Sequence, residues 1–284
     1  MIKIDRLSFG YGKKGLFQDL QLNLQPGNIY GLLGLNGAGK SSLLKLMTGL
    51  LFPQSGELLS LGYEPTRREP EFLSRVFFLP EEMNVPNVTI QEYVKIRAPF
   101  YPNFDHNAFN RYIGEFELPA GHKLIALSHG QKKKLLLSFG LTCNSSLLVL
   151  DEPTNGLDIP SKGQFRRLVA EAVTDKRIFV ISTHQVRDVE SLIDSIVVLH
   201  KGRVLFNHAM SDINARIRMS HVASKPDDNT SDLLYCEPAV GGFWTVWKDT
   251  CAEDGLIDLE VLFDTVISHP DIYTSLFNLA EASA

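Results

Sequence analysis

The sequence predicts an α/β fold with a mainly parallel core sheet, and three observations support this class. Strand-like runs alternate with amphipathic stretches from residue 147 onwards, which is typical of parallel strands joined by helices. A buried-strand pattern at NIYGLLG is followed at once by a glycine-rich loop and a helical pattern. The chain has 284 residues and is 44% hydrophobic, so it is long enough for one main domain and a small additional piece.

The first half of the chain begins with strands and then turns helical. Residues 2–34 contain the strand patterns IKIDRLSF, LFQDLQLNL and NIYGLLG, with turns at 10–15 and 26–27. After the glycine-rich loop, SSLLKLMTGLL predicts a helix that includes Leu50 and Leu51. Strands follow at ELLSLG and RVFFLP. Residues 84–140 are expected to form a helical insertion, with segments at VTIQEYVKI, AFNRYIGEF and QKKKLLLSFG.

The second half alternates strands and helices before it becomes irregular. The expected order is LLVLD, a helix around QFRRLVAEAV, RIFVIST, a helix around VRDVESLI, and the hairpin IVVLH-KG-RVLFN. Residues 220–232 are polar and read as a linker or exposed loop. Strands at LLYCE and GGFWTVWKD and a helix near DLEVLFDTVISH follow, with a small core expected from Phe243, Trp244, Trp247 and Phe263. The chain thus divides into a main domain, 1–208, and a small α+β accessory segment, 209–284.

Composition and charge narrow the class of protein. The formal net charge is -5, so we expect no positive field that attracts nucleic acid. The three cysteines have no ligand-like spacing and no matching histidine cluster, which argues against a metal-ligand or disulfide framework and favours a reducing cytosol. The first residues lack a secretion signal, and no run reaches ~18 apolar residues, so no direct insertion into a membrane is expected.

The strongest functional pattern is GLNGAGKS at residues 34–41, a glycine, four residues and then Gly-Lys-Ser. Glycines let the backbone wrap around phosphates, and the start of the following helix points amides at an anion. We therefore expect ATP to bind here, with Lys40 on the terminal phosphates, Ser41 on Mg2+ and Ser42 on an inner phosphate. The expected contacts are Asn36, Gly37, Ala38, Gly39, Lys40, Ser41 and Ser42. A chance glycine-rich turn is the alternative, and the strand-loop-helix context disfavours it.

Two adjacent carboxylates end the apolar run LLVLDEP at residues 147–153. A buried strand there would present Asp151 and Glu152 at the carboxyl edge of the sheet, where open α/β sheets bind ligands. We expect Asp151 to hold Mg2+ and Glu152 to orient or deprotonate the attacking water. Strands that end in solvated acids are common, so this prediction depends on the phosphate loop.

Further motifs in a fixed order make a resemblance specific. LSHGQ at residues 127–131 precedes LLVLDEP, and NGLD at 155–158 and STH at 182–184 follow it. With the phosphate loop, this set resembles the nucleotide-binding domain of ABC ATPases over about residues 1–208. The resemblance implies a P-loop NTPase fold of the ABC ATPase type, with an antiparallel β subdomain, a helical subdomain at about 84–140, and here a small C-terminal extension.

The resemblance also implies roles outside the phosphate loop. In the family, LSGGQ closes over the γ-phosphate of ATP held by a partner protomer. The residues that match it here are Ser128, Gly130 and Gln131. Tyr11 matches the aromatic residue that stacks on adenine, and His184 matches the switch histidine that contacts the γ-phosphate. Asp158 matches the aspartate that communicates across the dimer.

The sequence departs from the family pattern at two positions. His129 replaces the small second residue of LSGGQ and must find room beside the partner's nucleotide. Glu81 stands after RVFFLP, where the family commonly has a glutamine that touches Mg2+ or the water and relays to the transport partner. We expect Glu81 to approach the nucleotide or the metal. The lysine run 132–134 is read as a solvated helix face rather than a basic binding patch.

The family match implies a Mg-dependent ATPase that powers a separately encoded membrane permease. FYPNFD at residues 100–105 is similar to ATPases of exporter-type systems. The expected assembly is a homodimer, or a heterodimer with a related subunit, with ATP at the interface, located in the cytoplasm at the inner face of the membrane. Two alternatives stay open: a regulatory nucleotide-binding module with little turnover, and a soluble ABC ATPase without a transport role.

Overall fold

The core of the molecule is a six-stranded sheet in the order β5-β6-β7-β3-β8-β9. The computed structural model describes residues 1–119, 121–227, 230, 232–248 and 257–278. The sheet strands are β5 (Val76–Leu79), β6 (Leu147–Asp151), β7 (Ile178–Ser182), β3 (Asn28–Leu33), β8 (Ser195–His200) and β9 (Arg203–Ala209). All neighbours pair in parallel except β8 and β9, which form an antiparallel hairpin. The predicted α/β class with a mainly parallel core sheet is confirmed.

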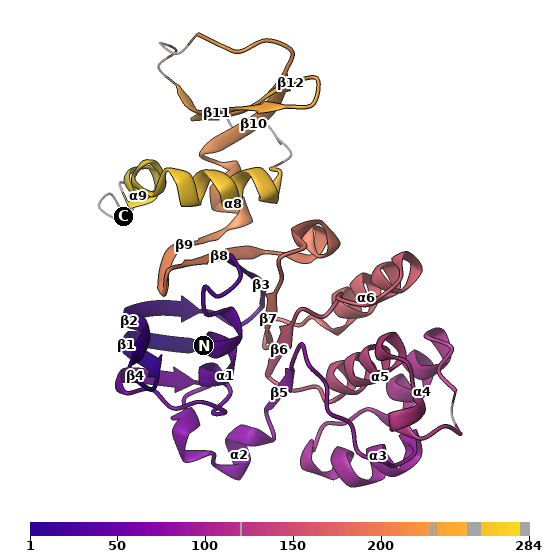
Figure 1. Cartoon of the computed structure of the whole chain (residues 1–284). Helices are drawn as coiled ribbons and strands as arrows, with labels where there is room; N and C mark the ends of the chain where they lie inside the picture. Colours follow the sequence, from indigo (N-terminus) through magenta and orange to yellow (C-terminus); the bar gives the residue numbers. More distant parts are fainter. Residues whose placement is uncertain (120, 228–229, 231, 249–256, 279–284) are drawn as a thin grey trace.

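A smaller antiparallel sheet packs beside the core sheet (Figure 1). Its order is β2-β1-β4, with β1 (Ile2–Tyr11), β2 (Lys14–Leu24) and β4 (Ser55–Ser60). Along β1 the side chains of Ile2 and Ile4 are buried and Lys3 between them is exposed, as the two-residue period of a strand requires. They join one apolar cluster with Leu43 on helix α1 and Val149 on β6, so α1 lies between the two sheets.

Helix α1 (Lys40–Met47) is shorter than the sequence predicted. Thr48 and Gly49 end it: the Thr48 hydroxyl donates to the Leu44 carbonyl (2.9 Å), and Gly49 has φ +70°. A glycine in the left-handed region is a common helix stop, because it has no Cβ to clash. Leu50 therefore lies outside the helix and is 47% exposed.

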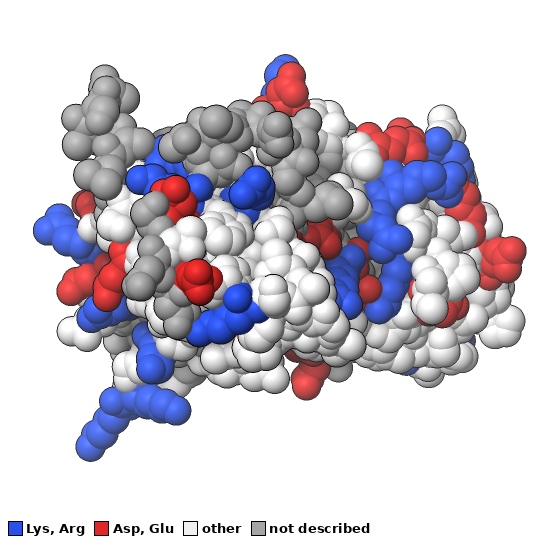
Figure 2. Space-filling model, turned by 90° about the horizontal axis from the view of Figure 1, so that it is seen from above, with Lys and Arg blue, Asp and Glu red and all other residues white. Residues whose placement is uncertain are grey.

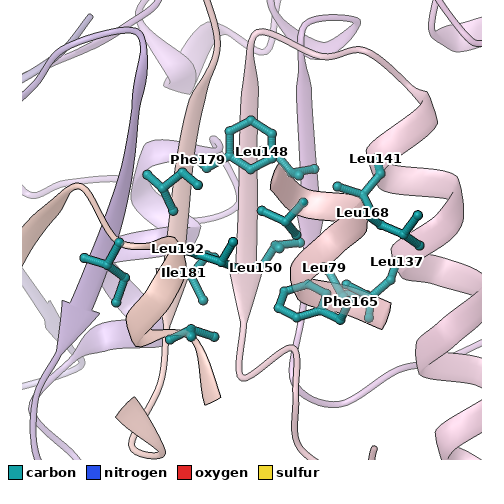
Figure 3. Close-up of a cluster of buried hydrophobic side chains, with 14 of the residues drawn as sticks. Leu79, Leu137, Leu141, Leu148, Leu150, Phe165, Leu168, Phe179, Ile181 and Leu192 are labelled. Atoms are coloured by element: carbon teal, nitrogen blue, oxygen red, sulfur yellow. The ribbon is translucent and has the colours of Figure 1, made fainter. Parts of the chain in front are cut away.

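Helices gather on the β5 side of the core sheet (Figure 1). They are α2 (Pro70–Leu73), α3 (Ile90–Arg97), α4 (His106–Glu115) and α5 (His129–Thr142), with α6 (Ile159–Ala172) beside α5. Figure 3 shows the packing that fixes α5 and α6 on the sheet: Leu137 and Phe165 from the helices lie beside Leu79 of β5, and Leu148 of β6 belongs to the same buried cluster. These side chains are all buried, so the elements that carry LSHGQ and NGLD rest on a rigid base.

The helix predicted around VRDVESLI is wrong. The structure has two short 3-10 turns there, Val186–Asp188 and Glu190–Leu192. Val186, Val189 and Leu192 are buried and recur every three residues, and Ile193, directly after the second turn, is buried as well. A spacing of three matches the three residues per turn of a 3-10 helix, so this segment buries one face without an α-helix.

The C-terminal segment contains elements that the sequence reading missed. They are α7 (Met210–Asn214), β10 (Ile217–Val222) and α9 (Pro270–Asn278); the expected ones are β11 (Leu233–Ala239), β12 (Gly242–Lys248) and α8 (Leu259–Ser268). Three strands form a separate antiparallel sheet in the order β10-β12-β11. The linker prediction for 220–232 is therefore wrong at its start, where residues 220–222 pair with β12. Residues 228, 229 and 231 lie outside the described part of the chain.

Helices α8 and α9 lie between β8–β9 and the separate sheet (Figure 1). Their buried side chains include Leu262, Val266 and Phe277, and these belong to the same apolar cluster as Phe206 on β9. Of the predicted aromatic core, Trp244 and Phe263 are partly buried against this cluster, whereas aliphatic residues of α8 such as Leu262 and Val266 are buried members of it. The proposed division at residue 208 falls inside β9.

The visible surface carries charges of both signs (Figure 2). Seen from the side of the separate sheet, Lys and Arg are interspersed with Asp and Glu, and no one sign covers the visible face (Figure 2). Within the described ranges, none of the helices has the length and apolar character needed to cross a bilayer.

Candidate functional site

A cavity of about 470 Å³ opens at the carboxyl ends of the core strands. Residues from separate segments line this cavity together, and they are those predicted to act within one protomer. They are Tyr11 on β1, Asn36 and Gly37 in the loop, Gly39 to Ser42 at the start of α1, Glu81 after β5, Asp151 and Glu152 at the end of β6, and His184 after β7. Ala38 lies beneath the cavity instead, 7% exposed in the cluster below the loop.

The phosphate loop has the tight shape that its glycines predicted. Gly37 and Gly39 have φ +79° and +108°, in the left-handed region that favours glycine. A Cβ on Gly39 would lie 2.7 Å from the Phe17 ring, so a side chain there would push the loop away from β2. Helix α1 starts at Lys40, and its first residues line the cavity. The free amides at the start of this helix are therefore located at the cavity wall.

Lys40 is the buried cation of the cavity. It is 8% exposed, and its Nζ donates to the Gly34 carbonyl (2.6 Å). Burial lowers the pKa of Lys40, while the nearby carboxylates of Glu152 and Asp151 act to raise it. Its ammonium group is therefore placed between the loop backbone and the acids at the end of β6.

Asp151 and Glu152 are both buried and each has a defined partner. Asp151 is 3% exposed and accepts a hydrogen bond from the Ser182 hydroxyl (2.5 Å). Glu152 is 5% exposed, and its Oε1 lies 2.8 Å from His184 Nδ1. The His184 amide also approaches Glu152 Oε2 (3.4 Å). The carboxylate of Glu152 and the imidazole of His184 thus form one unit at the cavity.

The backbone of Glu152 is in an unusual conformation. Its φ is +48°, in the left-handed region, where a non-glycine residue costs about 1–2 kcal/mol. The strain is maintained by its surroundings, because the Glu152 amide donates to the Ser182 carbonyl (3.0 Å). Strained residues that are held in this way are often found at functional sites.

The LSHGQ residues lie at the start of α5, away from the cavity. Ser128 caps the helix: its hydroxyl accepts from the Gln131 amide (3.2 Å), and Gln131 Oε1 accepts from the Ser128 amide (2.9 Å). Asp158 caps α6: its Oδ1 accepts from the Ser161 amide (2.9 Å), and the hydrogen bonds from Ser161 lower the pKa of its carboxyl. Of the described residues that line the cavity, none comes from LSHGQ or from Asp158.

Comparison with known proteins identifies the chain. The family model for ABC transporters matches residues 17–155. The ABC transporter ATP-binding protein YtrB of Bacillus subtilis is 30% identical over 198 residues, which cover 69% of this chain and 68% of that protein. The bacitracin transport ATP-binding protein BcrA of Bacillus licheniformis is 30% identical over 241 residues, 82% of this chain and 78% of the relative. This chain belongs to the family of ABC transporter ATP-binding proteins.

Solved structures agree with this assignment. The structure of an ATP-binding subunit of an ABC transporter superposes with a TM-score of 0.69 at 26% identity, covering 75% of this chain and 92% of the other. A dimeric ATP-binding cassette in a post-hydrolysis state with ADP and Pi shares the fold, with a TM-score of 0.65 at 22% identity over 74% of this chain and 99% of that one. The resemblance inferred from the motifs is confirmed: the chain is an ATP-binding ATPase domain of the ABC type.

His129 of this ABC ATPase packs within its own protomer. Gly156, in NGLD, has φ +79°, and a Cβ added to it would lie 2.8 Å from His129 Cδ2. A Cβ on Gly130 would lie 2.9 Å from the Gly156 carbonyl oxygen. The LSHGQ and NGLD motifs therefore approach each other closely at Gly130 and Gly156, which have no side chains to keep them apart. The imidazole of His129 covers the NGLD turn.

Glu81 forms part of a polar network at the rim of the cavity. Its Oε1 accepts from Asn155 Nδ2 (3.2 Å), and Asn155 Oδ1 accepts from Gln185 Nε2 (3.3 Å). Gln185 directly follows His184, so the network joins the segment after β5 to NGLD and to the segment after β7. Asn155 belongs to the NGLD motif, so the sequence pointed to it, but no motif includes Gln185.

Lys133 contradicts the prediction of a solvated lysine face. Its side chain is 0% exposed, and its Nζ donates to the backbone carbonyls of Glu152 (3.0 Å) and Glu81 (3.4 Å). Lys132 and Lys134 are only half-buried. The sequence reading missed Lys133 because a run of charges is usually solvated.

The oxygen donors of the site suit Mg2+. Mg2+ prefers hard oxygen ligands and commonly binds one or two carboxylates while it keeps several waters and substrate phosphates. Ser41 and Asp151 supply a hydroxyl and a carboxylate at the cavity, and Glu81 lies at its rim. Within the described part of the chain, no group of three or more His, Cys, Asp or Glu side chains forms a dedicated metal cage.

Proposed function

We propose that this chain hydrolyses Mg-ATP in a sandwich dimer and thereby drives a separate membrane permease. The observation that supports it most directly is the pair of Glu152 and His184 facing the phosphate loop across one cavity. A buried carboxylate there has the position of a general base for the attacking water, and the buried ammonium of Lys40 has the position to neutralise the phosphates.

Each residue of the cavity then has a distinct task. Lys40 and the first amides of α1 hold and neutralise the β- and γ-phosphates, and Tyr11 offers its ring to adenine. Ser41 and Asp151 would hold Mg2+, with Glu81 near it; when bound, the ion neutralises charge that develops on the phosphates. Glu152 orients and deprotonates the water, and His184 contacts the γ-phosphate while it fixes the Glu152 carboxylate.

The remaining predicted residues support a composite site. Ser128, Gly130 and Gln131 are located at a helix start that does not line the cavity of their own protomer. A helix start with free amides suits an anion. In the proposed homodimer each LSHGQ segment closes over the ATP of the other protomer, and Asp158 faces the same interface.

A second groove supports contact with a permease. This groove of about 700 Å³ lies between the core sheet and the helical region, and Leu50, Phe78, Phe100 and Tyr101 line it. Phe100 is 65% exposed and Leu50 is 47% exposed, which gives an apolar surface near Glu81. We propose that the permease docks here and that the chain is thereby held at the inner face of the membrane. The relative named for bacitracin transport supports a role in transport.

Substitution of Glu152 tests the proposal. We expect Glu152→Gln to lower phosphate release from saturating Mg-ATP at least ~100-fold while ATP binding is kept, because the amide cannot accept the proton. Glu82→Gln is the matched control, since Glu82 is exposed and does not line the cavity. Wild-type turnover in Glu152→Gln would remove Glu152 from the mechanism. ATP binding without turnover in the wild type would instead support the regulatory alternative.

The docking surface is tested separately. Phe100→Asp places a charge in the apolar groove, so we expect less of the chain to sediment with membranes that contain its permease. The ATPase rate of the isolated chain should be unchanged, since Phe100 is outside the nucleotide cavity. Unchanged sedimentation would exclude this groove as the docking surface.

A further inference from the structure

Lys133 is a buried charge that the proposed chemistry leaves without a role. It lies in the second turn of α5, fully buried, and its ammonium group donates to two backbone carbonyls rather than to a carboxylate. Burial lowers the pKa of Lys133, and the carboxylates of Glu81, Asp151 and Glu152 oppose this shift. Burial of a lysine is unfavourable unless its surroundings compensate the charge, and here three acids do so.

The contact with Glu152 is made at a strained point of the backbone. Glu152 has φ +48°, and hydrogen bonds to its own amide and to its own carbonyl hold it there. Its amide donates to the Ser182 carbonyl (3.0 Å), and its carbonyl accepts from Lys133 Nζ (3.0 Å). Without the ammonium group, the carbonyl of Glu152 would be buried without this donor, and the residue could relax toward more favourable backbone angles. Such a change would turn the carboxylate away from the cavity.

We propose that Lys133 is a positioning residue that holds Glu152 in its strained conformation and connects α5 to the hydrolytic site. The inference rests on the proposed role of Glu152. Lys133 acts through the Glu152 backbone and, through the longer bond to the Glu81 carbonyl, on the segment after β5. A neutral donor could satisfy these carbonyls, but only a cation also balances the acids beside them.

The position of Lys133 along α5 gives the contact a further consequence. Ser128 caps this helix and Lys133 follows five positions later, about one and a half turns along the same rigid helix. In the sandwich dimer, the start of α5 faces the ATP of the partner, while Lys133 holds the Glu152 of its own protomer. Closure on one ATP is therefore transmitted to the general base of the other site.

Lys133→Met removes the ammonium group and keeps a long apolar side chain. We expect kcat to fall roughly tenfold or more, since small displacements of a catalytic group have effects up to ~100-fold, while KM for ATP changes less than about twofold. Lys132→Met is the matched control on the same helix, and we expect it to keep the wild-type kcat. Thermal unfolding of both variants checks that they fold. If Lys133→Met does not fold, Lys133→Gln keeps a shorter neutral donor and should show an intermediate kcat.

A double-mutant cycle with Glu152→Gln separates positioning from other roles. If Lys133 acts through Glu152, Lys133→Met should lower the residual rate of Glu152→Gln by less than about twofold. The same fold-change in both backgrounds, or an unchanged kcat in Lys133→Met and Lys133→Gln, would overturn the inference. Wild-type turnover in Glu152→Gln would refute the proposed function and this inference together, whereas a slow Glu152→Gln with a fast Lys133→Met would refute this inference alone.

Discussion

The packing of α8 predicts that the C-terminal segment stabilises the whole protein. Leu262 on α8 is 0% exposed and belongs to the cluster that includes the core strands β8 and β9. Leu262→Ala removes buried carbon atoms and leaves a cavity, a change that typically costs 2–5 kcal/mol. In a protein of this size, each kcal/mol of lost stability lowers the midpoint of thermal unfolding by about 2 °C. A loss of about 3 kcal/mol therefore lowers this midpoint by roughly 6 °C.

The assay is thermal unfolding followed by circular dichroism, with Leu59→Ala as the control. Leu59 is 37% exposed on β4, so we expect its replacement to change the free energy of unfolding by less than about 1 kcal/mol. Two separate transitions in Leu262→Ala, with the larger one unshifted, would show that the C-terminal segment unfolds independently and does not stabilise the rest of the protein. The same packing predicts that deletion of residues 220–284 destabilises the core.

Two further predictions concern the nucleotide site. Tyr11→Ala should raise KM for ATP by roughly 5- to 150-fold, because stacking of a base on an aromatic ring contributes about 1–3 kcal/mol. Tyr11→Phe keeps the ring, loses only the hydrogen bond between Tyr11 and Ser42 (3.0 Å) and should stay close to wild type. Equal KM values for Tyr11→Ala and wild type would exclude stacking on Tyr11. Asp151→Asn should raise the Mg2+ concentration for half-maximal ATPase at least ~10-fold, as expected when a metal site loses a charged oxygen ligand, and an unchanged Mg2+ titration would place the ion elsewhere.

The sequence predicted the cavity well because its chemistry depends on short local motifs. Lys40 follows a strand and a glycine loop, and Glu152 and His184 follow buried strands. Asp151 is the last residue of its strand, β6, and the carboxyl ends of parallel strands meet at one edge of the sheet, so residues far apart in the sequence converge there. The structure brings Glu152 and His184 into contact as this rule requires.

Lys133 shows what local patterns could not predict. Its acceptor carbonyls belong to residues 19 and 52 positions away in the chain, and both contacts depend on how α5 packs against the sheet. Neighbouring lysines at 132 and 134 gave the run the character of a solvated face. Burial of a single charge within such a run depends on tertiary structure.

The C-terminal segment was harder to predict for a related reason. Large aromatic residues such as Trp244 suggested a separate core, but the aliphatic face of α8 packs onto β8 and β9 instead. The segment around Val189 also shows an apolar spacing that fits a 3-10 turn as well as one face of an α-helix. In both places the choice depends on the surface that the rest of the fold presents.

In the proposed dimer, each hydrolytic site combines the phosphate loop of one protomer with the LSHGQ segment of the other. Lys40→Ala disables the loop, and Ser128→Asp keeps an N-cap while it places a negative charge against the partner's γ-phosphate. Each variant alone should be inactive. A 1:1 mixture should recover about a quarter of the wild-type rate, because half of the dimers are mixed and each of these keeps one intact site. A mixture no more active than the two separate variants would show that the hydrolytic site is not shared between two protomers.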